Sequence, residues 1–277
     1  MNITWCAIID DPAGRIDYDE TGAGPAIVLV PGSCSTGAAW RPTTATWNSR
    51  FRSITTSLLG YGGTAERRSA QDPSIDHEAE IVEAVIARAG GNVHLVGHSF
   101  GGLISLAVAL RHRVGLKSLT IVEAPAVEIL RQRGEHEHYR GFQNMTEAYF
   151  ADFKAGRSDA IGMMIDFYGG AGTFASWPPK LRAYAIETTA VNLIDWASAY
   201  GYAPSSEALR EIEIPVLVIT GSASNPVARR ANELLAESIQ GAKLITIEGA
   251  AHFMIATHAA EVGGLIAGHV AKAELAS

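Results

Sequence analysis

A tight junction between two apolar segments is the feature that most constrains how this chain can fold. Residues 93–97 (VHLVG) form a short apolar run of the kind that makes a buried strand, and residues 100–112 form a longer apolar run that we predict to be a helix. Between them stands Gly97-His98-Ser99-Phe100-Gly101. A strand can pass so abruptly into a helix only through a strained turn. Glycines are needed two residues either side of Ser99, because a Cβ there would clash with neighbouring backbone.

Short β-forming runs and longer helix-forming segments alternate along most of the chain. We predict strands at residues 4–9, 15–18, 26–30, 53–59, 93–97, 117–123, 215–220 and 243–248, and helices at 75–89, 100–112, 226–239 and 258–272. Strands that alternate with helices predict an α/β fold, with a mostly parallel central sheet flanked by helices.

The alternation breaks between residues 126 and 204. That stretch has no convincing strand and is rich in helix formers and aromatic residues, and the strand pattern resumes at EIEIPVLVIT. We therefore expect a helical cap at 126–204, inserted between two core segments at 1–125 and 205–277. Most of its aromatic side chains should pack the interior of the cap, and the others should line whatever the cap covers.

Composition indicates a globular protein and argues against nucleic-acid binding and membrane insertion. The chain has 277 residues, 47% of them hydrophobic and 18% charged, as expected for one large globular domain with an insertion. The net charge of −7 argues against a nucleic-acid partner, because phosphates would be repelled. There is no run of about 18 or more apolar residues that would span a membrane. MNITWCAIIDDPAG lacks the features of a secretory signal, and we expect Cys6 and Cys34 to be reduced thiols in a cytoplasmic protein.

The junction also determines where Ser99 must lie. Open α/β sheets bind their ligands at the carboxyl ends of the strands, and the predicted turn places the Ser99 hydroxyl at that edge. The helix that begins behind it directs free backbone N–H groups to the same place, which favours developing negative charge. A Gly-x-Ser-x-Gly pattern also arises by chance as a packing turn, so its value here rests on the strand before it and the helix after it.

Four segments resemble the α/β-hydrolase family. YDETGAGPAIVLVPGS resembles the family's second and third strands and its oxyanion loop, and LLGYGGT resembles the next glycine-rich loop. GHSFGG resembles the nucleophile elbow, and EGAAHF resembles the terminal histidine loop. The resemblance covers essentially the whole chain, although 126–204 is similar only in kind. It implies an α/β-hydrolase fold with a helical cap, a serine nucleophile at Ser99, and no metal or organic cofactor.

The resemblance further implies an oxyanion hole, in which two backbone N–H groups face the oxygen that becomes negative during acyl transfer. One donor is Phe100, the residue after the nucleophile, and the other is Ser33 in the loop Pro31-Gly32-Ser33-Cys34. The family usually has histidine where this chain has Pro31. That departure leaves the donor intact but changes how the loop is anchored.

His252 is the candidate general base among the nine histidines. It lies in a loop between a late strand and the closing helix, as the base of the family does, and His258 is the second candidate. We interpret His98, inside the elbow, as structural. His136 and His138 do not share one helical face, so a solvated surface is favoured over a metal site.

The acid of the triad is where the chain departs from the commoner family pattern. Ser224 stands where the family usually has aspartate, and a hydroxyl cannot stabilise an imidazolium as a carboxylate does. Some capped members take the acid from the end of the preceding strand, and here TIVEAPA places Glu123 at that position. We therefore assign the acid to Glu123. The alternatives are a hinge role for Glu123, with Glu128 as the acid or no acid at all.

The resulting expectation is an esterase-like serine hydrolase. It would cleave an ester-type bond (carboxylester, thioester or lactone) of a small, partly apolar substrate through an acyl-enzyme on Ser99. Serine at this position argues against haloalkane dehalogenase and epoxide hydrolase chemistry, which in this family need a carboxylate there. Substrate contacts are expected at Cys34, Trp177 and Phe167, although a buried, unreactive thiol is the alternative for Cys34.

Three other functions stay open at this point. The same triad could run C–C bond hydrolysis or a lyase reaction, because the cap and pocket decide what the base attacks. A cofactor-free perhydrolase or haloperoxidase is a second alternative, and a catalytically impaired ligand-binding member of the fold is a third. Apart from a small-molecule substrate no partner is expected, and the chain is expected to be a monomer or homodimer.

Overall fold

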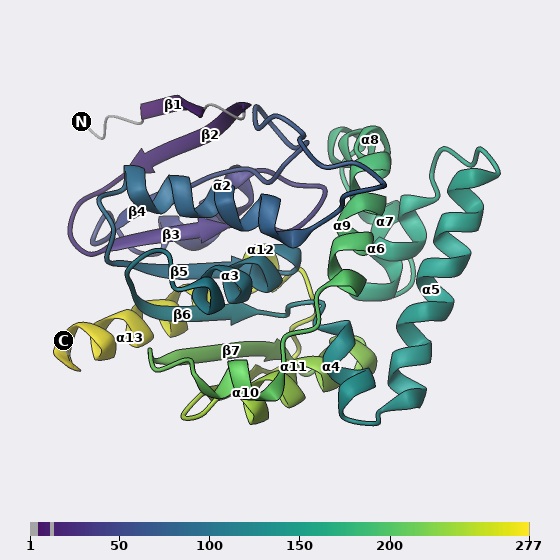
Figure 1. Ribbon diagram of the computed structural model, residues 1–277. Coiled ribbons are helices and arrows are strands. Elements are labelled where there is room, and N and C mark those ends of the chain that lie inside the picture. The colour runs from purple at the N-terminus through teal and green to yellow at the C-terminus, as the bar shows by residue number, and fades with distance from the viewer. Residues whose placement is uncertain (1–4, 12–13, 277) are drawn as a thin grey trace.

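The computed structural model describes residues 5–11 and 14–276, and it contains a central eight-stranded sheet (Figure 1). The strand order is β1-β2-β4-β3-β5-β6-β7-β8. The strands are β1 (Trp5–Asp11), β2 (Gly14–Thr21), β3 (Ala26–Val30), β4 (Arg52–Thr55), β5 (Val93–His98), β6 (Leu116–Val122), β7 (Val216–Gly221) and β8 (Lys243–Ile247). From β4 to β8 every neighbouring pair is parallel, and at one edge β2 pairs antiparallel with both β1 and β4. The predicted mostly parallel sheet is confirmed.

Helices cover both faces of this sheet. One face packs against α2 (Ile75–Arg88), α3 (Phe100–Arg111) and α11 (Pro226–Ser238). The other packs against η1 (Gly37–Trp40), α12 (Met254–Thr257) and α13 (Ala259–Ala276), and the short α1 (Arg41–Ala45) lies against α13. Strand β3 shows why the central strands are apolar throughout, since Val28 and Val30 join the first core while Ile27 and Leu29 join the second.

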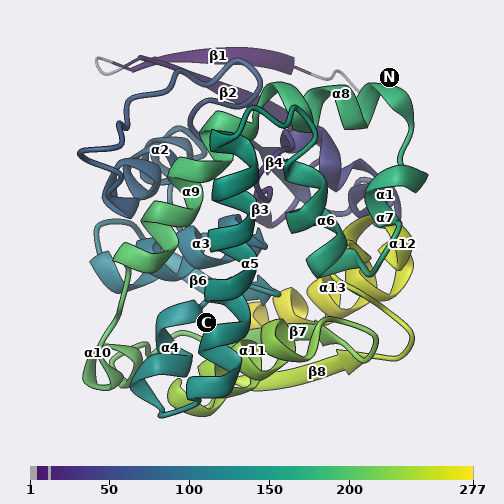
Figure 2. The same cartoon turned by 90° about the vertical axis from the view of Figure 1, so that its right-hand side faces the viewer.

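A helical insertion separates β6 from β7. It comprises α4 (Val127–Gln132), α5 (His136–Lys154), α6 (Ile161–Gly169), α7 (Thr173–Ser176), α8 (Pro179–Glu187), α9 (Thr189–Gly201) and α10 (Ser206–Arg210). Most of it lies beyond the carboxyl ends of the parallel strands, and Figure 2 looks onto it from that side. The insertion falls where the alternation was expected to break. Its division from the core at residues 126 and 204, as a separate cap domain, stays a prediction.

Several predicted boundaries differ from the structure. The strand predicted at 53–59 ends at Thr55, because the polar groups of the next residues bond to other segments: Thr56 Oγ1 donates to the Asp17 carbonyl and Ser57 Oγ to the Asp17 carboxylate. The helix predicted at 258–272 begins at Ala259 and is preceded by the short α12. Helices η1 and α1 were not predicted. Thr4, the predicted start of the first strand, and the side chain of Cys6 lie outside what the structure describes.

None of the helices in the described part of the chain combines the length and the apolar character that crossing a membrane would require.

Close backbone approach fixes the junction of β5 and α3. A Cβ on Gly101 would lie 2.2 Å from the carbonyl oxygen of Pro31, and a Cβ on Gly97 would lie 2.2 Å from the carbonyl oxygen of Gly101. Neither contact can be relieved by rotating a side chain. The helix behind Ser99 therefore packs directly on the end of β3, and this contact requires both glycines.

This packing predicts opposite effects for the same substitution in two helices. Gly101→Ala should lower the free energy of unfolding by at least about 2 kcal/mol, because the methyl group meets the Pro31 carbonyl. Gly268→Ala in α13, where a Cβ meets nothing within 4 Å, should instead raise it by about 0.5–1 kcal/mol through helix propensity. Urea denaturation of the two variants and the parent checks the prediction. Equal effects would contradict the backbone contact.

Candidate active site

Ser99 occupies a strained turn between β5 and α3. Its backbone has φ +54° and ψ −128°, in a region that side-chain-bearing residues rarely adopt. The Ser99 N–H donates to the Val122 carbonyl at 2.8 Å, which ties the turn to the end of the neighbouring strand β6. The strain holds the Ser99 hydroxyl at the carboxyl edge of the sheet, facing the insertion.

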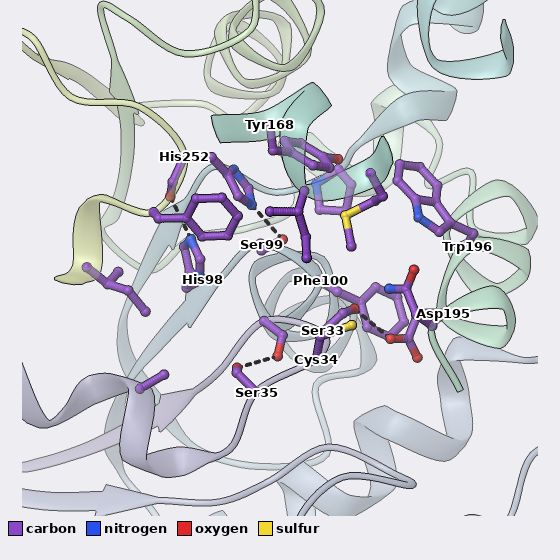
Figure 3. A pocket seen from close by; sticks show the side chains of 18 of the residues that line it. Ser33, Cys34, Ser35, His98, Ser99, Phe100, Tyr168, Asp195, Trp196 and His252 are labelled. Carbon is purple, nitrogen blue, oxygen red and sulfur yellow. Dashed lines mark hydrogen bonds between the residues drawn. The ribbon is translucent and has the colours of Figure 1, made fainter. Parts of the chain in front are cut away.

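Each ring nitrogen of His252 has one hydrogen-bond partner within this site. Its Nε2 lies 2.9 Å from Ser99 Oγ, and its Nδ1 lies 2.9 Å from Glu123 Oε2 (Figure 3 shows the Ser99 contact). Tyr168 stacks on the imidazole with ring centroids 4.1 Å apart. With a carboxylate beside Nδ1, the proton sits on that nitrogen, and Nε2 is left to accept the hydroxyl proton of Ser99.

Glu123 is held by backbone as well as by the histidine. It comes directly after β6 with φ +48°, and its side chain is fully buried. Thr220 Oγ1 and the Gly221 N–H donate to Oε1 at 2.8 and 2.9 Å, so Oε2 is left for His252. Burial alone would raise the pKa of this carboxyl, but the hydrogen bond and charge of His252, with smaller contributions from Ser224 and the Gly221 N–H, hold the pKa below its usual value. Glu123 is therefore ionised at neutral pH.

The alternative site residues lie elsewhere. Glu128 on α4 is bonded to Arg131 at 2.5 Å and to Tyr139 at 2.9 Å, and no contact with His252 is found among the described residues. His258 lies outside α12 and contacts its exposed neighbour Thr257. Ser224, at the usual acid position, is buried beside Glu123 rather than replacing it.

His98 was expected to be structural, and the structure shows what it holds. Its Nε2 lies 2.9 Å from the backbone carbonyl of His252, so it anchors the loop that carries the candidate base (Figure 3). Burial, with the nearby His252, lowers the pKa of His98 to about 3, so the ring is neutral and donates this hydrogen bond. No local pattern indicates this contact, since 154 positions separate the two residues.

The two predicted oxyanion donors lie beside Ser99. Gly32 approaches so closely that a Cβ on it would lie 2.9 Å from Ser99 Cβ, which brings the following Ser33 next to Ser99. Ser35 Oγ donates to the Gly32 carbonyl at 2.8 Å and closes the loop. Within the described part of the chain, the N–H groups of Ser33 and Phe100 donate to no protein acceptor, so both remain available to a substrate oxygen.

A cavity opens above Ser99 between the core and the insertion. Including its mouth to solvent it has a volume of about 830 Å³. Most of its walls are apolar, and the described residues that line it include Met164, Ile165, Tyr168, Trp177, Trp196, Ala199, Phe253 and Ile255. Tyr168 and Trp196 were not singled out from the sequence, because helical periodicity cannot tell which face of α6 or α9 meets the cavity.

The three expected substrate contacts differ in position. Cys34 and Trp177 line the cavity, whereas Phe167 is not among the described lining residues. The ring of Phe167 packs on Phe142, because consecutive helical side chains point about 100° apart and its neighbour Tyr168 takes the cavity side. Burial, with the nearby Asp195 carboxylate, raises the pKa of the Cys34 thiol to about 12, so this thiol stays protonated.

The described lining of the cavity carries an acidic side chain, the carboxylate of Asp195, but no lysine or arginine. Nor does the described part of the chain contain a group of three or more His, Cys, Asp or Glu side chains arranged to hold a metal ion. The chemistry available here is that of a serine hydroxyl, a histidine, a carboxylate and two backbone N–H groups.

Similar proteins agree with this fold. The sequence profile described as "Alpha/beta hydrolase family" matches residues 27–264. The chain is 23% identical to a 2-hydroxymuconate semialdehyde hydrolase of Pseudomonas sp., over 95% of its own length and 93% of that protein. It is 35% identical to a pimeloyl-[acyl-carrier protein] methyl ester esterase of Vibrio cholerae over only 109 residues, 39% of this chain and 40% of that enzyme. The match to the esterase thus spans less than half of either protein.

Solved structures show the same architecture at low identity. A thermophilic esterase from Thermogutta terrifontis superposes with a TM-score of 0.75 at 19% identity, covering 99% of both chains. Est816, described as an N-acyl homoserine lactone degrading enzyme, gives a TM-score of 0.72 at 22% identity and covers 95% of this chain and 99% of its own. The predicted family and enzyme class are confirmed by these matches: the chain belongs to the alpha/beta hydrolase family.

Proposed function

We propose that this protein is a serine hydrolase that cleaves an ester-type bond of a small, partly apolar and uncharged substrate. The observation that carries the proposal is the hydrogen-bonded series Ser99–His252–Glu123 at the floor of an apolar cavity. Each contact in the series is 2.9 Å, and the free N–H groups of Ser33 and Phe100 belong to the two segments that meet at Ser99.

Acylation begins when Ser99 Oγ attacks the substrate carbonyl carbon and its proton passes to His252 Nε2. The carbonyl oxygen becomes negative and is stabilised by the N–H groups of Ser33 and Phe100. The bond to the leaving oxygen then breaks, and that oxygen takes the proton from His252. Water repeats the sequence: it gives a proton to His252, adds to the acyl carbon, and releases the acid as Ser99 regains the proton.

Glu123 stabilises His252 in both protonation states. Its Oε2 accepts the Nδ1 proton and keeps Nε2 directed at Ser99. When His252 becomes positively charged, the buried carboxylate offsets that charge in a region of low dielectric constant. Assigning the acid role to Glu123 explains how the chain can carry Ser224 where aspartate is commoner.

The charge of the cavity favours ester hydrolysis over C–C bond hydrolysis of acidic substrates. One similar protein is named for a dienoic acid, a 2-hydroxy-6-oxo-6-(2'-aminophenyl)hexa-2,4-dienoic acid hydrolase of Metapseudomonas resinovorans. The carboxylate of such a substrate would need a cation, but the described lining offers Asp195 instead. A neutral ester, thioester or lactone meets no such penalty.

Removing the nucleophile tests the proposal directly. Ser99→Ala should abolish covalent labelling by a fluorophosphonate probe and lower hydrolysis of p-nitrophenyl hexanoate by at least about a thousandfold, with an unchanged melting temperature. Labelling is measured by the mass of the intact protein. A parent protein that neither takes up the probe nor turns over esters, thioesters or lactones would instead indicate a ligand-binding function.

The acid is tested by a pair of isosteric changes. Glu123→Gln retains shape but removes the charge that stabilises the His252 imidazolium, so kcat should fall at least about a hundredfold. Glu128→Gln, which alters a buried carboxylate bonded to Arg131 and Tyr139, should leave kcat within about threefold of the parent. The opposite ranking of the two variants would transfer the acid role to Glu128, and two unaffected variants would indicate a dyad without an acid.

Substrate charge is tested by two esters of equal chain length. The enzyme should hydrolyse p-nitrophenyl hexanoate with a kcat/KM at least about tenfold above that for mono-p-nitrophenyl adipate, whose terminal carboxylate finds no cation in the cavity. The measurement is release of p-nitrophenolate at several substrate concentrations. Equal or better turnover of the adipate ester would favour an acidic substrate and reopen C–C hydrolysis.

A further inference from the structure

A buried ionic cluster joins helix α9 of the insertion to two loops of the core. Asp195 on α9 accepts hydrogen bonds from Ser33 Oγ at 2.5 Å and Tyr61 OH at 2.6 Å on Oδ2, and from Arg68 Nη1 at 2.8 Å on Oδ1. The side chain of Asp195 is 2% exposed and that of Arg68 is 0% exposed. The mechanism proposed above assigns no step to any of these side chains.

Arg68 makes the cluster rigid. Besides Asp195, its guanidinium donates to Glu66 Oε2 at 2.9 Å and to the Leu59 carbonyl at 3.3 Å, and it forms an ion pair with Glu78 Oε1 at 3.1 Å. A planar guanidinium that engages several acceptors in this way fixes their relative positions as well as its own. Arg68 therefore holds Asp195 through Oδ1, and Oδ2 presents a fixed acceptor to the Ser33 hydroxyl.

The Ser33 peptide is consequently constrained from two sides. On one side, Gly32 packs against Ser99 so closely that no Cβ would fit. On the other side, the Ser33 hydroxyl is bound to Asp195, 162 positions along the chain. The N–H of Ser33 lies between these two contacts, so its direction relative to Ser99 depends on both of them. Figure 3 shows the Ser33–Asp195 bond beside the cavity floor.

We propose that Asp195 is a positioning residue, which orients the Ser33 N–H toward the substrate oxyanion and thereby makes the oxyanion hole depend on the seating of helix α9. This inference rests on the proposed serine hydrolase function. Asp195 acts through Ser33 and needs no contact with the reacting atoms. Because an oxyanion donor acts mainly in the transition state, losing the link lowers kcat and leaves KM little changed.

The test compares Ser33→Ala, Asp195→Ala and the double variant. Removal of one oxyanion donor costs about 100- to 1,000-fold, and misorientation of one should cost less, so we expect each single variant to lose about 10- to 100-fold in kcat with KM within about threefold. Since both changes break the same bond, the double variant should lose no more than Asp195→Ala alone. Turnover of p-nitrophenyl hexanoate and the rate of fluorophosphonate labelling supply the readouts.

Ser198→Ala is the matched control. Ser198 lies on the same helix and its hydroxyl donates to the Pro73 carbonyl of the core, but it does not reach the oxyanion loop. This variant should keep kcat within about twofold of the parent while losing a comparable link between α9 and the core. Melting temperatures of all four variants separate loss of fold from loss of rate.

Other outcomes overturn the inference in distinguishable ways. If Ser33→Ala has the same kcat as Ser198→Ala, the Ser33 hydroxyl does not orient the Ser33 N–H. This comparison remains valid even if Asp195→Ala fails to fold. Losses that multiply in the double variant would give Ser33 and Asp195 separate roles, and a change confined to KM would make Asp195 a substrate contact. Absence of labelling in the parent protein would instead refute the proposed function.

Discussion

The close approach of strand β5, helix α3 and the loop after β3 is the constraint on which the rest of this structure depends. Gly97 and Gly101 allow backbone to meet backbone at distances that a Cβ would block. The helix therefore starts directly after Ser99, and the loop carrying Ser33 lies against Ser99. The backbone strain at Ser99 is sustained because the strands around it are packed against helices on both faces of the sheet.

The remaining groups reach Ser99 because parallel strands end at one edge. Glu123 follows β6 in a left-handed backbone conformation, which directs its carboxylate at the end of β7 and at His252. Gly221 at the end of β7 admits the Ala250 carbonyl where a Cβ would lie 2.1 Å from it, and this brings the His252 loop across the sheet edge. A carboxylate at the end of β6 therefore reaches His252 although Ser224, after β7, carries none.

Local patterns in the sequence were sufficient for the sheet, the elbow and the insertion. They were also sufficient to associate Ser99, His252 and Glu123, which the structure brings together although they come from three separate loops. Patterns were not sufficient where distant segments decide the outcome. The residues after Thr55 have the pattern of a strand, but the side chains of Thr56 and Ser57 bond to Asp17 instead. Phe167 was predicted to contact substrate, whereas its neighbour Tyr168 lines the cavity, because no local signal shows which side of α6 faces it.

Two buried carboxylates beside the cavity show how partners, rather than burial alone, determine charge. Glu123 has His252 to itself, and its pKa is lowered. Burial raises the pKa of Asp195 despite Arg68, because the same guanidinium also serves Glu66 and Glu78, and burial likewise raises the pKa of Glu78 to about 8. Because Arg68 is shared among these carboxylates, it offsets their negative charge but leaves no further positive charge to bind an acidic substrate. The walls are thus largely apolar, and in the proposed mechanism such surroundings would let the two backbone N–H groups beside Ser99 act on a developing oxyanion more strongly than they could in water.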